Sequence, residues 1–167
     1  MKKIIGSVLV LIAIVLSSCV TGGFDENPQL DSRNEALAKA PKVESVFVNG
    51  VPVERNTQSI RVVNAKVGDV LAVSASLSSG KSATLKELEV SRQYYRSEAP
   101  QPLDPLSGDG FYDLTGNTYV FDYDYTVPVE DDDGFEFHPG DVILVYFRVS
   151  NTLDNYGYKA FEIHIEE

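Results

Sequence analysis

The feature that most constrains the fold is a two-residue alternation of apolar and polar side chains, which begins at Val43 and recurs to the end of the chain. Alternation of this period is typical of β-strands that bury one face. The clearest examples are "DVLAVSASL", "LKELEVSRQYY", "TYVFDYDYTVP", "DVILVYFRV" and "AFEIHIEE". No long amphipathic helical pattern separates them, so this part of the chain predicts an all-β domain of antiparallel strands.

The same alternation predicts which side chains lie between two packed sheets. The expected core consists of Leu71, Val73, Leu88, Val90, Phe121, Tyr123, Ile143, Val145, Phe147, Phe161 and Ile163. Tyr146 and Arg148 alternate with this set, and we therefore expect them to face outward.

A hairpin is predicted at the start of the domain. In "VFVNGVPV", Asn49 and Gly50 lie between two short β-branched runs, and both residues accept the positive φ angles that a two-residue hairpin turn requires. Pro52 cannot donate a backbone hydrogen bond, which confines its strand to a sheet edge.

The order of the segments "LKELEV", "NTYVFDYDYTVP" and "GDVILVYFRVSNTLDNYGYKAFEIHIEE" resembles the C, E, F and G strands of immunoglobulin-like domains in Bacteroidota lipoproteins. The resemblance covers residues 43–167 and implies an immunoglobulin-like antiparallel β-sandwich of about seven strands. With one cysteine and no tryptophan, the chain lacks the inter-sheet disulfide and the core tryptophan of antibody domains.

The N-terminus predicts export. Lys2 and Lys3 precede an aliphatic run from Ile4 to Leu16, as in a signal peptide. The sequence Leu16-Ser17-Ser18-Cys19 resembles the bacterial lipobox, which implies removal of residues 1–18 and lipid attachment at Cys19. The protein is then expected to be anchored in the outer membrane of a Gram-negative bacterium through its acyl chains. An ordinary signal peptide with an incidental thiol is the alternative.

The segment from Val20 to Lys42 contains few large apolar residues, and we expect residues 19–42 to form a lipidated, flexible tether. "NEALAKA" is long enough for one helical turn only. Asp25 and Glu26 resemble the surface-export signal of Bacteroidota lipoproteins, although they lie somewhat late for it. Surface display and the periplasmic face both remain open.

Charge narrows the choice of partners. The chain carries a formal net charge of −11, and Arg148 and Lys159 are the only basic residues after residue 99. Such a surface repels nucleic acid and anionic lipid headgroups. Cations or a basic protein surface remain open as partners on this ground. The expected partners are the membrane, through the lipid, and an envelope protein or a glycan.

Catalytic patterns are weak. Gly80-Lys81-Ser82 resembles the end of a phosphate-binding loop, but the required upstream glycine is Ala75, and a turn between strands is the simpler interpretation. His138 and His164 are the only histidines, and no nucleophile and base can be paired from the sequence. We expect a protein that is not an enzyme and that needs no cofactor or metal.

The loop "VEDDDGFEFHPGD" is the first candidate for ligand chemistry. Asp131, Asp132, Asp133 and Asp141 supply the hard oxygens that calcium prefers, although their spacing matches no EF-hand. Weak calcium binding and a solvated, self-repelling loop are both open interpretations.

The second candidate is the long connection "APQPLDPLSGDGFYDLTGNT", which carries Phe111 and Tyr112 and follows Tyr94 and Tyr95. These aromatic side chains either form a partner-binding surface or cover the edge of a sheet. In an immunoglobulin-like topology this connection and the acidic loop share the end of the domain remote from the tether. We therefore expect one acidic, aromatic binding tip.

Two functions are consistent with these observations. The first is a non-catalytic envelope lipoprotein that acts as a binding or adaptor module through loops at its membrane-distal end. The second is a structural surface spacer or fimbria-like subunit that associates by strand exchange.

Overall fold

The strands predicted from the alternation are present. The computed structural model describes residues 28–95, 104–106, 108–131 and 133–167, and Ala38–Glu167 form one compact unit. The strands in this unit are β1 (Lys42–Val48), β2 (Val51–Pro52), β3 (Val62–Ala65), β4 (Val70–Ser78), β5 (Leu85–Tyr95), β6 (Asp104–Pro105), β7 (Phe111–Asp113), β8 (Thr118–Thr126), β9 (Val142–Asn151) and β10 (Tyr156–Ile165).

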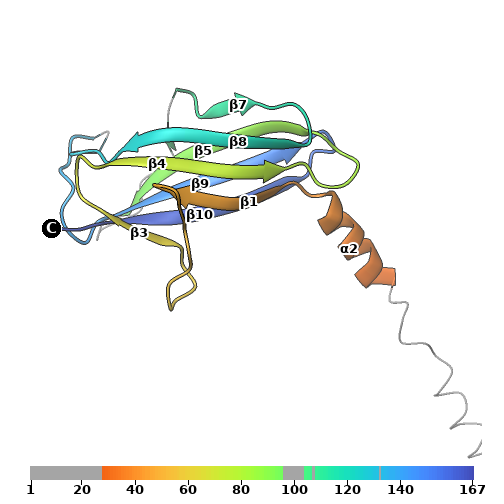
Figure 1. Ribbon diagram of the computed structural model, residues 1–167, viewed down its shortest axis with the longest axis horizontal. Helices are drawn as coiled ribbons and strands as arrows, with labels where there is room; N and C mark the ends of the chain where they lie inside the picture. The colour runs from red at the N-terminus through yellow and green to blue at the C-terminus, as the bar shows by residue number, and fades with distance from the viewer. Residues whose placement is uncertain (1–27, 96–103, 107, 132) are drawn as a thin grey trace, which may run out of the picture. The chain divides into compact units, whose positions relative to one another are not determined.

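The strands form two sheets, seen as two layers in Figure 1. A four-stranded sheet has the order β2-β1-β4-β8, and a six-stranded sheet has the order β3-β10-β9-β5-β6, with β7 also paired to β5. β3 runs parallel to β10, whereas the other strand pairs of the described residues are antiparallel. The all-β prediction is confirmed.

The core lies between the two sheets. Phe147 of β9 is fully buried, and its ring lies 5.9 Å from that of Phe121 of β8 in an edge-to-face arrangement, so the contact joins the layers. Phe161 of β10 stacks on Phe147 at 6.5 Å. The predicted core residues are buried, except Tyr123, which is partly buried against them.

The predicted hairpin is also confirmed. Asn49 and Gly50 have φ angles of 53° and 75°, and Val48 pairs with Val51 across the two-residue turn. The Asn49 side chain accepts a hydrogen bond from the Ala72 amide at 2.9 Å, which ties the turn to β4. Pro52 lies in β2, at the edge of its sheet, as expected.

The structure corrects the prediction for part of the tether. Residues Pro28–Lys39 form the helix α2, whereas the sequence indicated an irregular segment with one helical turn at most. Pro28 fits the first position of a helix because its fixed φ is helical and its missing amide proton would have no partner there. Ala36, Leu37 and Ala38 favour continued helix.

The ends of the strands show which loops share the end of the domain where β1 begins. Lys42, at the start of β1, pairs with Ser78, at the end of β4. The β4–β5 loop and the β9–β10 turn therefore lie at the end where β1 begins. The side chain of Asn151 links this turn to the β4–β5 loop. Its Nδ2 atom donates hydrogen bonds to Lys39 O at 2.7 Å and to Ser79 O at 2.8 Å, and its Oδ1 atom accepts hydrogen bonds from the backbone amides of Leu153 and Asn155.

The prediction that the long connection and the acidic loop share the far end of the domain holds for the acidic loop only, which follows Thr126 where β8 ends beside Val70 at the start of β4. The described residues of the long connection run back along β5 instead of forming a loop at the far end. Phe111 pairs with Glu89, and Gly116 O accepts a hydrogen bond from the Leu85 amide at 2.7 Å, at the end where β1 begins. Pairing with β5 satisfies the backbone groups of this segment, which a free loop would leave to water.

Candidate binding surface

The structure divides the predicted site residues: Phe111 and Tyr112 pair with Glu89 and Leu88 of β5, whereas Tyr94 and Tyr95 lie at the end of that strand. Cys19 and Asp132 lie outside the described residues. Tyr94 is only 2% exposed and packs edge to face on Phe137 with ring centroids 5.0 Å apart, so it belongs to the core. Its assignment to a binding surface is wrong because it lies four residues after Val90, on the same inner face of β5. Tyr95, the next residue, is exposed at the end of that strand.

Phe111 and Tyr112 lie on β7 and have different environments. Phe111 is exposed, whereas the partly buried Tyr112 ring meets Phe121 at 5.2 Å in an edge-to-face contact. Burial raises the pKa of the Tyr112 phenol above its ordinary value. Tyr112 thus covers the side of the core between β5 and β8, which is the structural alternative that the sequence left open.

The acidic loop is organised by one buried carboxylate. The Oδ1 atom of Asp131 accepts hydrogen bonds from the amides of Asp133 and Phe135 at 3.0 and 2.9 Å, and Asp131 is buried. Asp133 is exposed. Among the described residues, no three acidic, histidine or cysteine side chains gather closely enough to hold a metal. The calcium hypothesis includes Asp132 and remains a prediction.

An aromatic surface occurs elsewhere, on the outer side of the six-stranded sheet. We call Glu89, Tyr146, Arg148, Tyr156 and Tyr158 the tyrosine face. Tyr146 stacks on Tyr158 with centroids 5.9 Å apart and planes at 30°, and Tyr158 stacks on Tyr156 at 6.5 Å and 22°. Tyr156 and Tyr158 are 46% and 56% exposed. The three rings form a near-parallel row that solvent can reach.

Strand register explains how these side chains meet. Tyr158 pairs with Arg148 across β9 and β10, and Tyr146 pairs with Ala160. Tyr146 therefore lies diagonally opposite Tyr158, within reach of a long side chain. Ala160 has a small side chain, which limits crowding beside the Tyr146 ring.

An ion pair completes the tyrosine face. The Nε atom of Arg148 lies 2.8 Å from Oε2 of Glu89 on β5, and its guanidinium carbon lies 5.4 Å from the centre of the Tyr156 ring. The guanidinium is thus held between a carboxylate and an aromatic ring. Burial raises the pKa of the Tyr146 phenol, and the neighbouring Tyr158 adds to this effect.

The sequence contained a partial signal for the tyrosine face. Its alternation predicted that Tyr146 and Arg148 face outward. The last alternating segment, "AFEIHIEE", begins at Ala160, whereas β10 already begins at Tyr156. Starting the last strand four residues earlier would have placed both tyrosines on the outer face with Tyr146.

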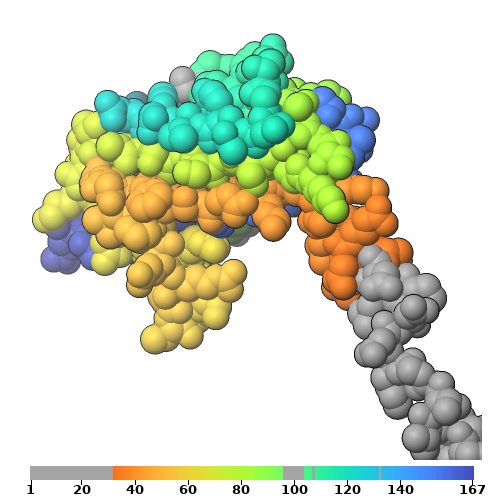
Figure 2. All heavy atoms as spheres, turned by 45° about the vertical axis from the view of Figure 1, so that its right-hand side comes forward, coloured from red at the N-terminus to blue at the C-terminus, as the bar shows by residue number. Residues whose placement is uncertain are grey.

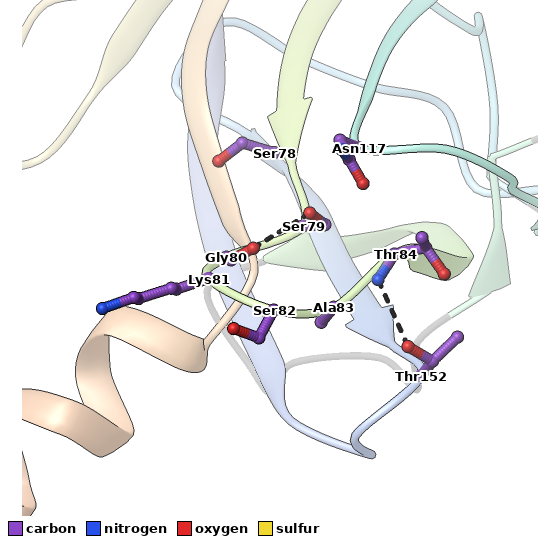
Figure 3. Close-up of a pocket in the computed structure, with 9 residues that line it drawn as sticks. All are labelled: Ser78, Ser79, Gly80, Lys81, Ser82, Ala83, Thr84, Asn117 and Thr152. Carbon is purple, nitrogen blue, oxygen red and sulfur yellow. Dashed lines mark hydrogen bonds between the residues drawn. The ribbon is translucent and has the colours of Figure 1, made fainter.

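A shallow hollow of about 630 Å³ lies over the β4–β5 loop (Figure 3). Its lining is mostly small and polar: Ser78, Ser79, Gly80, Lys81, Ser82, Ala83, Thr84, Asn117 and Thr152. The Lys81 side chain extends away from Asn117 and Thr84, and its amide donates to Ala38 O at 2.7 Å. A strand follows this loop, which confirms a turn in place of a phosphate-binding loop.

The segment 53–61 between β2 and β3 projects from the two sheets (Figure 2). The Asn56 side chain accepts hydrogen bonds from the amides of Gln58 and Ile60 at 2.9 and 3.0 Å, and Arg55 pairs with Arg61 at its base. These bonds give the projection an ordered turn.

No helix in the described part of the chain is long and apolar enough to cross a membrane.

Comparisons with known proteins add little. No family model and no curated sequence matches the chain. Spo0M, a sporulation control protein from Bacillus subtilis, is similar in structure with a TM-score of 0.43 and 13% identity, over 77% of this chain and 50% of that protein. The chain thus spans half the length of that protein.

Two β-glucosidases are similar over a smaller share of their length. The enzyme from Listeria innocua has a TM-score of 0.38 and 14% identity, over 72% of this chain and 16% of the enzyme. The enzyme from Erythrobacter marinus has a TM-score of 0.37 and 17% identity, over 60% and 14%. Likenesses this low support no statement about the activity of this chain.

Proposed function

We propose that the protein is a non-catalytic, lipid-anchored binding module of the bacterial envelope, and that its contact surface is the tyrosine face. The observation that carries this proposal is the row of Tyr146, Tyr156 and Tyr158 beside the Arg148–Glu89 ion pair. Exposed aromatic rings flanked by polar groups are typical of surfaces that bind partners. A folded monomer seldom leaves such a row in water without use.

The proposed fold is an immunoglobulin-like β-sandwich. Two observations support it: β4 pairs with β8 in one sheet, and β5, β9 and β10 are neighbours in the other, as B, E, C, F and G strands would be. The parallel β3–β10 pair fits a first strand that changes sheets and joins the last strand.

The anchor is the part of the proposal that the N-terminal sequence supports. We expect Cys19→Ala to abolish membrane association and to leave the domain folded, since the lipid and the core are separate parts of the chain. Partitioning into a detergent phase measures this directly. A variant that still enters the detergent phase would disprove lipid attachment.

Site-specific photocrosslinking in the native envelope tests the contact surface. A benzoylphenylalanine is placed at position 158 of the full-length lipoprotein, and a second variant carries it at position 120. Val120 is 58% exposed on the outer side of the four-stranded sheet and is the matched control. We expect an adduct from position 158 alone. No adduct, or equal adducts from both positions, would refute the proposed surface.

A structural role by strand exchange is the second candidate, and β8 favours it. β8 is nine residues long and ends the four-stranded sheet, and within the described residues no strand pairs with its other edge. Unpaired edges can accept a strand from another chain. Concentration-dependent polymers in sedimentation velocity would favour this role, whereas a monomer at all concentrations would exclude it.

A further inference from the structure

We propose that the tyrosine face binds an extended, uncharged polysaccharide; this inference rests on the proposed role of that face as the contact surface. The shape of the face supports an extended ligand. Its three rings lie in a row across β9 and β10, and the side chains of Tyr156 and Tyr158 are about half exposed. An open row fits a chain that lies along the sheet, whereas small ligands usually bind in enclosed pockets.

The ring chemistry fits sugars. A pyranose ring has an apolar face of C–H groups that packs on an aromatic ring, and its hydroxyl groups point outward at the rim. Tyrosine has the complementary form, with an apolar ring and one polar hydroxyl. The near-parallel planes of Tyr146, Tyr158 and Tyr156 repeat one ring orientation along the row, so successive sugar units can meet the exposed parts of the rings in a similar way.

Hydrogen-bonding groups lie beside the rings. A guanidinium carries five N–H donors in a fixed fork, and Arg148 directs its Nε at Glu89. The Glu89 carboxylate is an acceptor with two oxygens. Donors and acceptors held in this way can bind the hydroxyl groups of a sugar without large loss of side-chain entropy.

Local charge favours an uncharged ligand. Arg148 and Glu89 neutralise each other within the tyrosine face, so the face offers no excess charge to an ionic polymer. The protein as a whole has a formal net charge of −11 and repels anionic chains. An uncharged polyol avoids this repulsion and still uses both members of the ion pair.

Each ring contributes modestly, and affinity should therefore depend on ligand length. Removing one ring is expected to weaken binding by about 2- to 13-fold, given about 0.5–1.5 kcal/mol for an aromatic contact beyond its buried area. Affinity should rise from one sugar unit to about three, the number of rings in the row, and then level off.

Affinity electrophoresis of the full-length protein in mild detergent tests the inference. The gels contain amylose, dextran, mannan, xylan or a mixed-linkage β-glucan, and alginate serves as an anionic polymer. We expect retardation by at least one uncharged polysaccharide and none by alginate. Tyr156→Ser combined with Tyr158→Ser should abolish the retardation. Tyr119→Ser is the matched control, because Tyr119 is a 38%-exposed tyrosine on the other sheet.

The outcomes separate this inference from the proposed function. No retardation in any uncharged polysaccharide, or an equal loss in Tyr119→Ser, would overturn the sugar assignment. Mass spectrometry of the photocrosslinked adduct from position 158 gives an independent answer. Added mass that glycosidases remove supports a polysaccharide. Crosslinked peptides from a second protein identify a protein partner, which refutes the inference and leaves the binding module in place.

Discussion

The outer faces of the two sheets differ sharply, although both sheets share one core. The outer face of the four-stranded sheet carries mainly small and acidic side chains, namely Ala72, Ser74, Ser76, Asp122 and Asp124, together with two separate exposed valines, Val70 and Val120. The outer face of the six-stranded sheet carries the tyrosine face. Both faces alternate with the same kind of buried residues, so the difference lies only in the outward positions.

This difference separates folding from binding. Inward residues such as Phe121 and Phe147 bury the apolar area that stabilises the domain. Outward residues contribute little to that burial and can vary in chemistry. Small and acidic groups keep one face hydrated and discourage association through it. The tyrosines keep apolar area on the other face available to a partner.

Phe147→Ala should cause the largest loss of stability, because it removes a fully buried ring from the core between the two sheets. Truncating a fully buried phenylalanine costs about 3–5 kcal/mol, out of about 5–15 kcal/mol for a typical domain. Urea denaturation followed by tyrosine fluorescence measures the loss. Arg148→Ala, one residue away on the outer face, should cost about 1 kcal/mol or less. Equal losses for the two variants would show that the assignment of inner and outer faces is wrong.

Asn151→Ala should have the next largest effect, because Asn151 ties the two sheets together where β1 begins. Its buried side chain binds Lys39 O, Ser79 O and two amides of the following turn. Each buried group left without a partner costs about 1–3 kcal/mol. Thermal unfolding should show a clear decrease in Tm, with Asn155→Ala as a milder comparison. An unchanged Tm would mean that these hydrogen bonds do not hold the sheets together.

Tyr156→Ser combined with Tyr158→Ser should change stability much less than either core variant. Cross-strand pairs contribute about 0.2–1 kcal/mol each, and both residues are exposed. The double substitution should lower the free energy of unfolding by about 1 kcal/mol. Val120→Ser, on the outer face of the other sheet, should lower it by less. A loss as large as that of Phe147→Ala would indicate that the tyrosine face is structural.

The smallest expected effect is a pH dependence specific to the tyrosine face. Burial raises the pKa of Tyr146 in the folded protein above its ordinary value of 10.0. Above pH 10 the unfolded chain loses this proton first, so stability is fully present below pH 10 and falls as the pH rises through the folded pKa. Urea unfolding between pH 9 and 11 should show a weaker decrease in Tyr146→Phe. The same slope in both proteins would contradict the burial of this phenol.

Sequence alternation by itself was enough to predict which side chains lie on the inner faces of the strands. Leu88, Val90, Ile143, Val145 and Ile163 were predicted to be buried and are buried, because a strand with one solvated face repeats its pattern every two residues. The Asn49-Gly50 turn was predictable for an equally local reason, since few residues other than asparagine and glycine accept its φ angles.

Which side chains come together at the candidate site is visible only in the tertiary structure. Tyr94 lies on the inner face of β5, where Phe137, 43 positions further along, packs on it, and the Asp131 carboxylate accepts hydrogen bonds from amides of its own folded loop. Tyr146 meets Tyr158 because β9 and β10 pair in one register. Alternation assigns a residue to a face, but it does not select the neighbours on that face. Those neighbours depend on strand pairing over long sequence separations, and a shift of one residue in register would replace every contact.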